Sequence, residues 1–146
     1  MKWKGYNIRV YGLLVNTKNE ILLSKEHRFG LKMIKFPGGG HELGEGIQDT
    51  LIREFQEELG IAIRIKEHFY TTDFLQASIF NKAEQLISIY YWVESDELDQ
   101  IVNGVQAKDL ENGDKHTFFW KAISTILPTE VTFPIDQLVV KKLQEN

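Results

Sequence analysis

The sequence predicts an α/β fold in which helices sandwich a β-sheet. Segments typical of strands and of helices follow one another in the order strands, helix, strands, helix, which is the order of a layered α/β or α+β domain. The chain has 146 residues, enough for one compact domain and too few for two, so we expect residues 1–146 to form a single domain. Its hydrophobic share of 42% and charged share of 26% are those of an ordinary globular protein.

The N-terminal part is expected to form two strands followed by irregular segments. Residues 6–15 are rich in β-branched and aromatic side chains and predict the first strand, and residues 16–20 predict the turn after it. Residues 21–25 predict the returning strand. We expect a loop over residues 28–35, and the Phe-Pro-Gly-Gly-Gly run at 36–40 is not expected to be regular structure.

Residues 47–59 carry the strongest helical pattern of the chain. Apolar side chains recur there at every fourth position, which predicts one stripe buried against the sheet. Gly60 follows directly, at the position where a left-handed residue commonly ends a helix. The stripe consists of Ile47, Leu51, Phe55 and Leu59.

Beyond this helix the pattern indicates strands again and then a second helix. Residues 61–65 alternate apolar and polar side chains, and residues 86–93 are largely hydrophobic, so each segment predicts a strand. Residues 94–115 form a long polar connection, and residues 117–120 predict a short strand. A last helix is expected behind Pro134. Its apolar stripe consists of Ile135, Leu138, Val139 and Leu143.

Composition and charge exclude several classes of protein. The chain has no cysteine, which excludes disulfides, cysteine-ligated zinc and cysteine nucleophiles and suits a reducing compartment, so we expect a cytoplasmic protein. With 21 acidic against 17 basic residues the net charge is −4, which does not favour binding to extended nucleic acid. No apolar run approaches the length of a membrane span, and the run at 10–15 is too short for a signal peptide, so no membrane association is expected.

Three carboxylates gather on the predicted helix. Glu54, Glu57 and Glu58 stand at i, i+3 and i+4, so they share one helix face and repel one another. Glu57 and Glu58 also lie beside the negative end of the helix dipole. A divalent cation would turn this repulsion into binding, and carboxylate oxygens favour Mg²⁺ or Mn²⁺ over zinc. The alternative for each pattern taken alone is a solvated acidic surface for the glutamates and a simple turn for the glycine run.

Together, the glycine run and the acidic helix form a longer pattern. Gly39 is followed by five residues and Glu45, and seven further residues lead to Arg-Glu-Phe-Gln-Glu-Glu-Leu-Gly-Ile at 53–61. This pattern resembles the Nudix box, G-x5-E-x7-R-E-U-x-E-E-x-G-U with U hydrophobic, at every fixed position, and a chance match is on the order of 10⁻⁹ per start position. The resemblance implies a Nudix-type α/β/α sandwich with a mixed sheet between helices. It also implies a MutT-like pyrophosphohydrolase that cleaves a nucleoside diphosphate linked to another group.

The resemblance further implies a metal site. Nudix enzymes use a divalent metal to help water attack phosphorus, so Mg²⁺ or Mn²⁺ is the expected cofactor. Glu54, Glu57 and Glu58 look like its ligands, with one of them able to deprotonate the water. Gly38 would offer its backbone carbonyl to a metal, and Glu45 would support metal-bound water or a second ion.

The resemblance also implies roles for residues around the expected metal site. Arg53 is the only cation among these acidic residues, and we expect it to orient the carboxylates and the glycine loop, beside an ordinary ion pair with Asp49. Family members often carry one more acidic residue downstream, as a ligand or base. Glu111 is our choice, with Asp114 and His116 as nearby substitutes and a solvated turn as the alternative.

Substrate contacts are predicted ahead of the glycine run and among aromatic residues. Lys25, His27 and Arg28 follow the second strand, where the family often binds phosphate, and Arg28 is the first choice. The alternative for each is a solvated surface charge. Four aromatic side chains are candidates for stacking on a base, although most aromatic residues at strand positions belong to the core. They are Phe69, Tyr70, Phe74 and Phe80.

The expected substrate is a small nucleotide or nucleotide derivative, and its base, sugar and leaving group stay open. The proline and the tyrosine that mark two Nudix subfamilies are missing at their usual places, as is the upstream coenzyme-A pattern. A second hypothesis is a Nudix-fold sensor that binds nucleotide without cutting it. Such proteins commonly lose box glutamates, and all of them are present here. Many family members form homodimers, and no feature of this sequence decides the oligomeric state.

Overall fold

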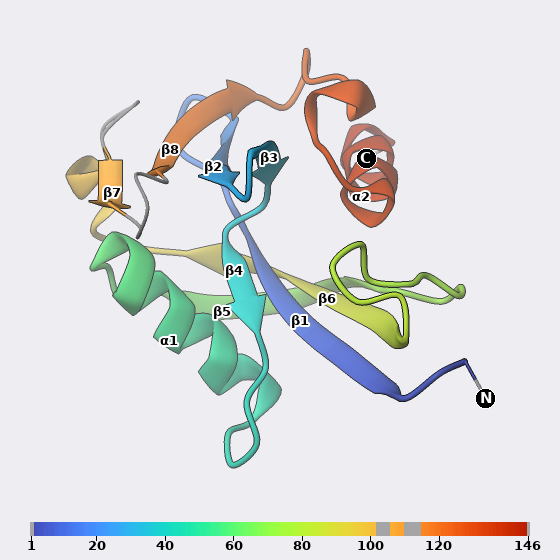
Figure 1. Cartoon of the computed structure of the whole chain (residues 1–146). Helices are drawn as coiled ribbons and strands as arrows, with labels where there is room; N and C mark the ends of the chain where they lie inside the picture. Colours follow the sequence, from blue (N-terminus) through green and yellow to red (C-terminus); the bar gives the residue numbers. More distant parts are fainter. Residues whose placement is uncertain (1, 102–105, 110–114, 146) are drawn as a thin grey trace.

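A layer of strands lies between two helices in the computed structural model of the chain, which describes residues 2–101, 106–109 and 115–145 (Figure 1). The strands form two four-stranded sheets. Helix α1 (Ile47–Leu59) packs on one side of them and helix α2 (Pro134–Gln144) on the other. This arrangement is the predicted α/β/α sandwich.

The first sheet is mixed, as the sequence predicted, and has the strand order β4-β1-β6-β5. Strand β1 (Gly5–Leu14) runs parallel to β6 (Glu84–Glu94) and antiparallel to β4 (Gly38–Gly40). Strand β5 (Arg64–Thr71) pairs antiparallel with β6. Strand β4 therefore forms an edge of this sheet, next to β1.

The second sheet is antiparallel throughout, with the order β3-β2-β8-β7. Short 3₁₀ helices lie in the connections, at Leu98–Gln100 and Pro128–Glu130. The strands are β2 (Glu20–Arg28), β3 (Leu31–Lys35), β7 (Gln106–Asp109) and β8 (Lys115–Ala122).

Alternating side chains of β1 divide the core into two clusters. Leu13 faces α2 and belongs to the cluster that contains Val139, whereas Leu14 faces α1 and belongs to the cluster that contains Phe55. Phe55 is fully buried, and burial of a side chain of this size stabilises a fold by about 2–3 kcal/mol. The apolar stripe of α1 thus anchors the helix while its acidic face stays available.

The ends of α1 follow from its sequence. The Gly46 N–H donates to Asp49 Oδ2 at 2.9 Å at the start of the helix. Asp49 has this capping role instead of the expected ion pair with Arg53, which is absent among the described residues. Gly60 ends the helix with a left-handed φ of 67°, as predicted. Within the described part of the chain, neither α1 nor α2 is long and apolar enough to cross a membrane.

Several segments differ from the predicted pattern. Residues 31–35, expected in a loop, form β3, because the turn after β2 needs only Phe29 and Gly30. The glycine run, expected to be irregular, forms β4, because pairing with β1 uses backbone groups alone. Strand β5 begins at Arg64, later than expected. The long polar connection contains β7, which pairs with β8.

Candidate active site

Helix α1 exposes its three predicted metal-binding carboxylates unequally. The Glu54 side chain is 14% exposed, that of Glu57 is 59% exposed, and Glu58 is half-buried. Glu54 lies against β4, where a Cβ atom on Gly39 would come within 2.4 Å of the Glu54 Oε2 atom. The glycine therefore lets this carboxylate approach the backbone of the edge strand.

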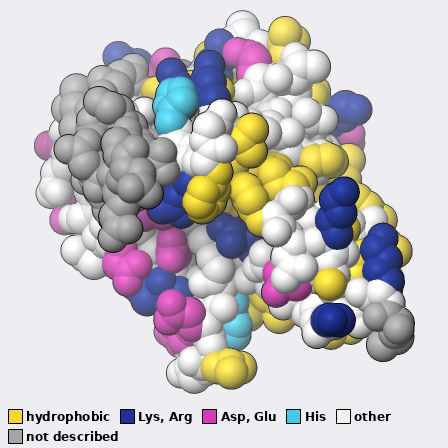
Figure 2. Space-filling view, viewed as in Figure 1, with side chains coloured by type: hydrophobic (Ala, Val, Ile, Leu, Met, Phe, Trp, Pro, Cys, Tyr) yellow, Lys and Arg dark blue, Asp and Glu magenta, His cyan; other side chains and the backbone are white. Residues whose placement is uncertain are grey.

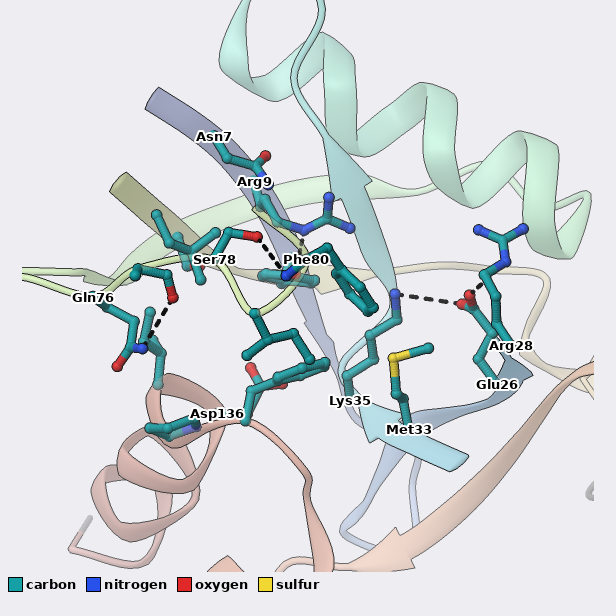
Figure 3. Close-up of a pocket in the computed structure, with 18 of the residues that line it drawn as sticks. Asn7, Arg9, Glu26, Arg28, Met33, Lys35, Gln76, Ser78, Phe80 and Asp136 are labelled. Carbon is teal, nitrogen blue, oxygen red and sulfur yellow. Dashed lines mark hydrogen bonds and ion pairs between the residues drawn. The ribbon is translucent and has the colours of Figure 1, made fainter. Parts of the chain in front are cut away.

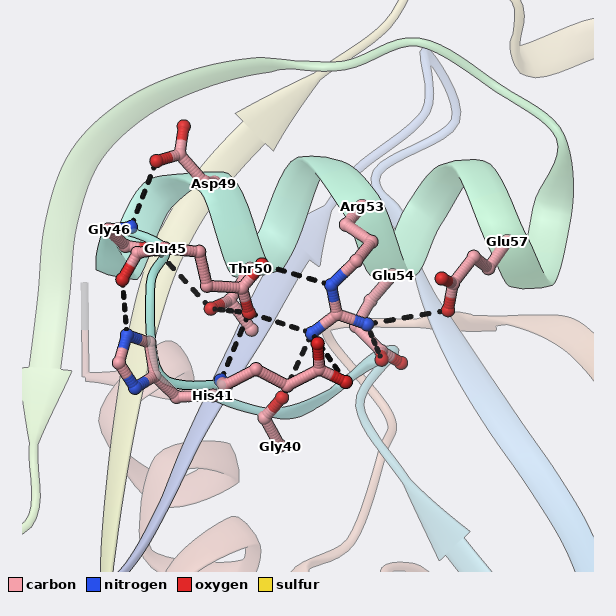
Figure 4. Close-up of polar contacts among 10 residues, drawn as sticks. Gly40, His41, Glu45, Gly46, Asp49, Thr50, Arg53, Glu54 and Glu57 are labelled. Carbon is pink, nitrogen blue, oxygen red and sulfur yellow. Dashed lines mark hydrogen bonds and ion pairs between the residues drawn. The ribbon is translucent and has the colours of Figure 1, made fainter.

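Arg53 connects the acidic residues to one another and to β4 (Figure 4). Its Nη1 atom donates to Glu54 Oε1 at 2.8 Å and to Glu57 Oε2 at 3.4 Å. Its Nε and Nη2 atoms donate to the two oxygens of Glu45 at 3.0 and 2.8 Å. The Nη2 atom also donates to the Gly40 carbonyl at 3.1 Å. These contacts fix the positions of the carboxylates relative to the glycine strand.

The Glu45 carboxylate is surrounded by donors from the protein. Its Oε1 atom accepts from Thr50 Oγ1 at 2.7 Å and from the Glu42 backbone N–H at 3.1 Å, in addition to Arg53. The hydrogen bonds from Arg53 and then from Thr50 lower the pKa of Glu45 to about 2. Glu45 is therefore ionised at neutral pH and engaged as a partner of Arg53.

Glu54 and Glu58 form a close pair of carboxyl groups. Burial, followed by the negative charge of Glu54, raises the pKa of Glu58 to about 9, and the Lys35 ammonium opposes this effect. The raised pKa of Glu58 follows from its burial beside Glu54, so the two carboxyl groups disfavour each other's charge when no cation lies between them. A divalent cation between two such groups favours both ionised forms and replaces the proton.

The residues of this face fit a hard divalent cation. The donors are carboxylate oxygens, burial beside Glu54 raises the pKa of Glu58, and Gly39 leaves the space that a Cβ atom would fill beside Glu54. Among the described residues, no three His, Asp or Glu side chains are already arranged around a single point to hold an ion. The contacts of Arg53 with Glu54 and Glu57 account for the present arrangement.

Gly39→Ala is expected to disturb the site and the fold together. The new Cβ atom would lie 2.4 Å from Glu54 Oε2, so the carboxylate or the strand must move. Overpacking of this kind destabilises by about 1–3 kcal/mol, which urea unfolding measures. Gly40→Ala is the matched control, because its Cβ atom would meet only Arg9 Nη1, at 3.6 Å. Equal losses of stability in the two variants would contradict the conclusion that Gly39 leaves the space for the Glu54 carboxylate.

A cavity of about 220 Å³ lies between the two sheets and the start of α2 (Figure 3). Strands β1, β2, β3 and β6 line it, together with residues 76–80 and 133–136. Three cations and two acids are among the lining residues, which suits a ligand that carries both acceptor and donor groups. These charged residues are Arg9, Arg28, Lys35, Glu26 and Asp136.

Glu26 is a buried carboxylate that is shared by several cations. Lys35 Nζ lies 3.4 Å from it, Arg28 Nε 3.5 Å and His116 Nε2 3.9 Å, and His116 Nε2 also lies 2.6 Å from Ser24 Oγ. Burial alone would raise the pKa of Glu26, but attraction from Lys35, His116 and Arg28 outweighs burial and lowers it. Glu26 therefore holds Lys35 and Arg28 at the wall of the cavity.

Arg9 connects the cavity to the acidic face of α1. The register of β1 places Arg9 opposite Gly40 on one side and Ser88 on the other. Its Nε atom donates to Tyr11 Oη at 2.7 Å. The phenol of Tyr11 is the largest influence that raises the pKa of Arg9, and Glu54 contributes to the same effect. The guanidinium is thus in electrostatic reach of the carboxylates.

Asp136 closes the opposite end of the cavity. It is only 2% exposed, and Tyr90 Oη donates to its Oδ1 atom at 2.5 Å. Burial raises the pKa of Asp136 to about 6, although Tyr90, Lys35 and Arg9 favour the ionised form. The wall of the cavity therefore contains a buried acid, Asp136, within electrostatic reach of Lys35 and Arg9.

Protonation of Asp136 is expected to make the protein more stable as the pH falls. Its folded-state pKa of about 6 exceeds the ordinary value of 3.8, so the native state binds more protons between these values. Its contribution to the free energy of unfolding is therefore present below about pH 4 and lost as the pH rises through about 6. The advantage of wild type over Asp136→Asn should grow by about 2 kcal/mol from near pH 7 to near pH 4.5 in urea unfolding. A constant or shrinking difference would contradict this.

The cavity receives one of the three predicted phosphate contacts. Arg28 lines it, and the side chains of Glu26 and Arg28 project from the same face of β2. Lys25 and His27 alternate to the other face of the strand and are not among the lining residues.

The aromatic candidates separate in the same way. Phe80 lines the cavity, whereas Phe69 packs against Trp92 and Tyr70 is buried in the core. Phe74 is exposed and is not among the lining residues.

The predicted downstream acid cannot be compared with the site. Glu111 and its substitute Asp114 lie outside the described residues. His116, the other substitute, is buried beside Ser24 and Glu26.

Sequence reasoning missed several charged residues of the cavity. Arg9 interrupts the hydrophobic strand 6–15 two residues before Tyr11, so the two side chains lie on the same face of the strand. This is a signal that a cation faces inward. Asp136 borders the apolar stripe of the last helix, next to Ile135, and gives a weaker signal of the same kind. Lys35 and Glu26 gave no such signal, because Lys35 was expected in a loop and Glu26 lies just beyond the strand predicted over residues 21–25.

Comparisons with known proteins agree with this architecture. A family model described as NUDIX domain matches residues 5–139. The 8-oxo-dGTP diphosphatase of Escherichia coli (strain K12) is 30% identical over 89 residues, 56% of this chain and 60% of that protein. The uncharacterized Nudix hydrolase YvcI of Bacillus subtilis (strain 168) is 40% identical over 58 residues, 40% of this chain and 35% of that protein.

A solved structure has the same fold. The MutT protein from Methanosarcina mazei Go1 superposes with a TM-score of 0.71 and 21% identity, over 97% of this chain and 95% of that one. The family match covers most of the chain, including β4, α1 and the start of α2. The chain therefore belongs to the NUDIX domain family.

Proposed function

We propose that the chain is a Mg²⁺- or Mn²⁺-dependent pyrophosphohydrolase. It would act in the cytoplasm, as one domain, on a nucleoside di- or triphosphate or a related derivative. The observation that carries the proposal is that Arg53 holds three box glutamates, Glu45, Glu54 and Glu57, next to a cavity lined by three cations and two acids. A polyphosphate needs positive charge along its length, and a nucleoside needs a pocket beside the reacting phosphate.

The carboxylates of α1 would hold the cation. Glu54, Glu57 and Glu58 are the proposed ligands, together with the carbonyl of Gly38 in the edge strand β4. When bound, the ion draws charge from phosphoryl oxygens and lowers the pKa of a water molecule. Arg53 orients Glu54 and Glu57 through its Nη1 atom.

We assign Glu45 a positioning role. Both of its oxygens accept hydrogen bonds from Arg53, and its pKa of about 2 keeps it ionised. It therefore holds the guanidinium in place for Glu54 and Glu57. The expectation that Glu45 also supports metal-bound water or a second ion stays a prediction.

The cavity would hold the nucleoside. Arg9 and Lys35 lie on its cationic side and would donate to acceptors on the base or phosphate, while Asp136 would accept from donors at the other end. Guanine carries acceptors at O6 and N7 and donors at N1 and N2, so its edges match this polarity. The E. coli relative is an 8-oxo-dGTP diphosphatase, so 8-oxo-dGTP and dGTP are the first substrates to assay.

A substrate panel tests the proposal. The purified chain is incubated with Mg²⁺ or Mn²⁺ and with 8-oxo-dGTP, the common nucleoside triphosphates, nucleotide sugars and dinucleotides, and phosphate and pyrophosphate release is measured. We expect metal-dependent turnover of at least one nucleotide, lost in Glu57→Gln. Nucleotide binding without turnover of any compound would overturn the proposal in favour of a sensor.

A further inference from the structure

Phe29 occupies an unfavourable position in the turn between β2 and β3. Its φ of 55° is left-handed, a conformation that a bulky side chain seldom adopts and that glycine or asparagine adopts readily. Its side chain is also 73% exposed to solvent. The ring lies outside both core clusters, so core packing does not explain an aromatic residue at this strained position, which points to a functional reason for it.

A second exposed ring faces Phe29 from another part of the chain. Phe80 is 58% exposed, and its ring centroid lies 6.0 Å from that of Phe29 with an interplanar angle of 61°. Both residues line the cavity, as does Ile79, which is exposed as well. Hydrophobic side chains gather near the middle of this face, close to the acidic side chains (Figure 2). Exposed apolar side chains therefore lie at the mouth of the charged cavity.

We propose that Phe29 and Phe80 form an aromatic clamp that receives the flat face of a nucleobase at the mouth of the cavity. The proposal rests on the nucleotide hydrolysis proposed above and assigns two residues that would contact the base. The edge-on contact of the two rings leaves ring faces available for stacking. The Arg28 guanidinium lies 5.8 Å from the Phe29 ring and adds positive charge beside the stacked base.

Alanine variants test the clamp without relying on turnover. Binding of AMP, GMP, CMP and UMP is measured by calorimetry in EDTA, and the tightest is used for all variants. We expect Phe29→Ala and Phe80→Ala each to weaken that binding by about 5- to 100-fold, the usual range for loss of base stacking. Phe29→Tyr keeps a ring and should bind like wild type. Leu75→Ala, an exposed apolar residue away from the cavity lining in the segment before Phe80, is the control.

Inorganic tripolyphosphate with Mg²⁺ distinguishes the clamp from a general effect on the site. It has no ring, so its affinity should stay within about 2-fold in both alanine variants if stacking is the only loss. Nucleotide binding unchanged in both variants, equal losses for tripolyphosphate, or a wild type that binds none of the monophosphates would overturn the clamp. If wild type binds nucleotide in a way that depends on the two rings but hydrolyses none of the compounds in the panel, the proposed hydrolysis is wrong and the proposed clamp is supported.

Phe29→Asn separates ligand binding from stability. Asparagine tolerates the left-handed conformation, so this variant should raise Tm by about 2–4 °C. The same substitution removes the ring and should weaken monophosphate binding as Phe29→Ala does. A variant that loses Tm and binding together would indicate a purely structural role for Phe29.

Discussion

Glu57→Gln is expected to abolish metal-dependent turnover while leaving the fold intact. Its side chain is 59% exposed, and the hydrogen bond that it accepts from Arg53 is long, at 3.4 Å, so little stability depends on it. The neutral amide is a poor ligand for a hard cation. We expect kcat to fall by roughly 10³-fold or more, which corresponds to the loss of about 4 kcal/mol of transition-state stabilisation.

Metal binding gives this prediction a second measurement. Mn²⁺ should raise the Tm of wild type, because a ligand that binds only the folded state stabilises it, and this shift should be much smaller in Glu57→Gln. Glu67→Gln removes an exposed acid from β5 instead and should behave like wild type. Undiminished turnover in Glu57→Gln would show that this carboxylate does not hold the metal.

Arg53→Gln is expected to lower both stability and activity. The guanidinium serves Glu45, Glu54, Glu57 and the Gly40 carbonyl, and an amide cannot reach all of them. Removing the partner of several half-buried acids should destabilise by about 2–4 kcal/mol. Activity should fall at least about 100-fold. Residues that orient metal ligands typically contribute 10- to 100-fold, and here three carboxylates lose the hydrogen bonds that orient them.

A matched arginine on the surface serves as the control. Arg64 pairs with Glu94 at 3.1 Å and Asp96 at 2.8 Å, but all three side chains are largely exposed. Arg64→Gln should therefore change the free energy of unfolding by less than about 1 kcal/mol. Urea unfolding measures the free energy of unfolding of both variants. Similar losses in Arg53→Gln and Arg64→Gln would mean that the Arg53 contacts stabilise the fold no more than a surface ion pair does.

The sequence predicted those parts of the fold that depend on local pattern. The four-residue spacing of Leu51 and Phe55 gave helix α1 and its buried face, and Gly60 marked the end of the helix. The box spacing gave the residues that the structure brings together around Arg53. These features need only neighbours within about one helix length of each other.

The parts that sequence reasoning missed depend on distant pairing. Strand β3 exists because Leu31–Lys35 pairs with β2, and β4 exists because three glycines pair with β1. The cavity likewise combines Arg9 with Asp136, from opposite ends of the chain. The local pattern around Arg9 or Asp136 can indicate that the side chain faces inward, but it does not indicate which distant residues lie beside it. The arrangement of charges in the cavity therefore became visible only in three dimensions.

Under the proposed function, the sharing of Glu26 among Lys35, Arg28 and His116 restricts how the substrate preference of the cavity can be redesigned. Exchanging Lys35 alone for a neutral side chain would leave a buried anion with less compensation, and the variant would lose stability before it could display a new preference. Libraries aimed at other nucleotides should therefore randomise positions 26 and 35 as a unit. Pairs that conserve the summed charge, such as Gln with Met, are the natural starting points.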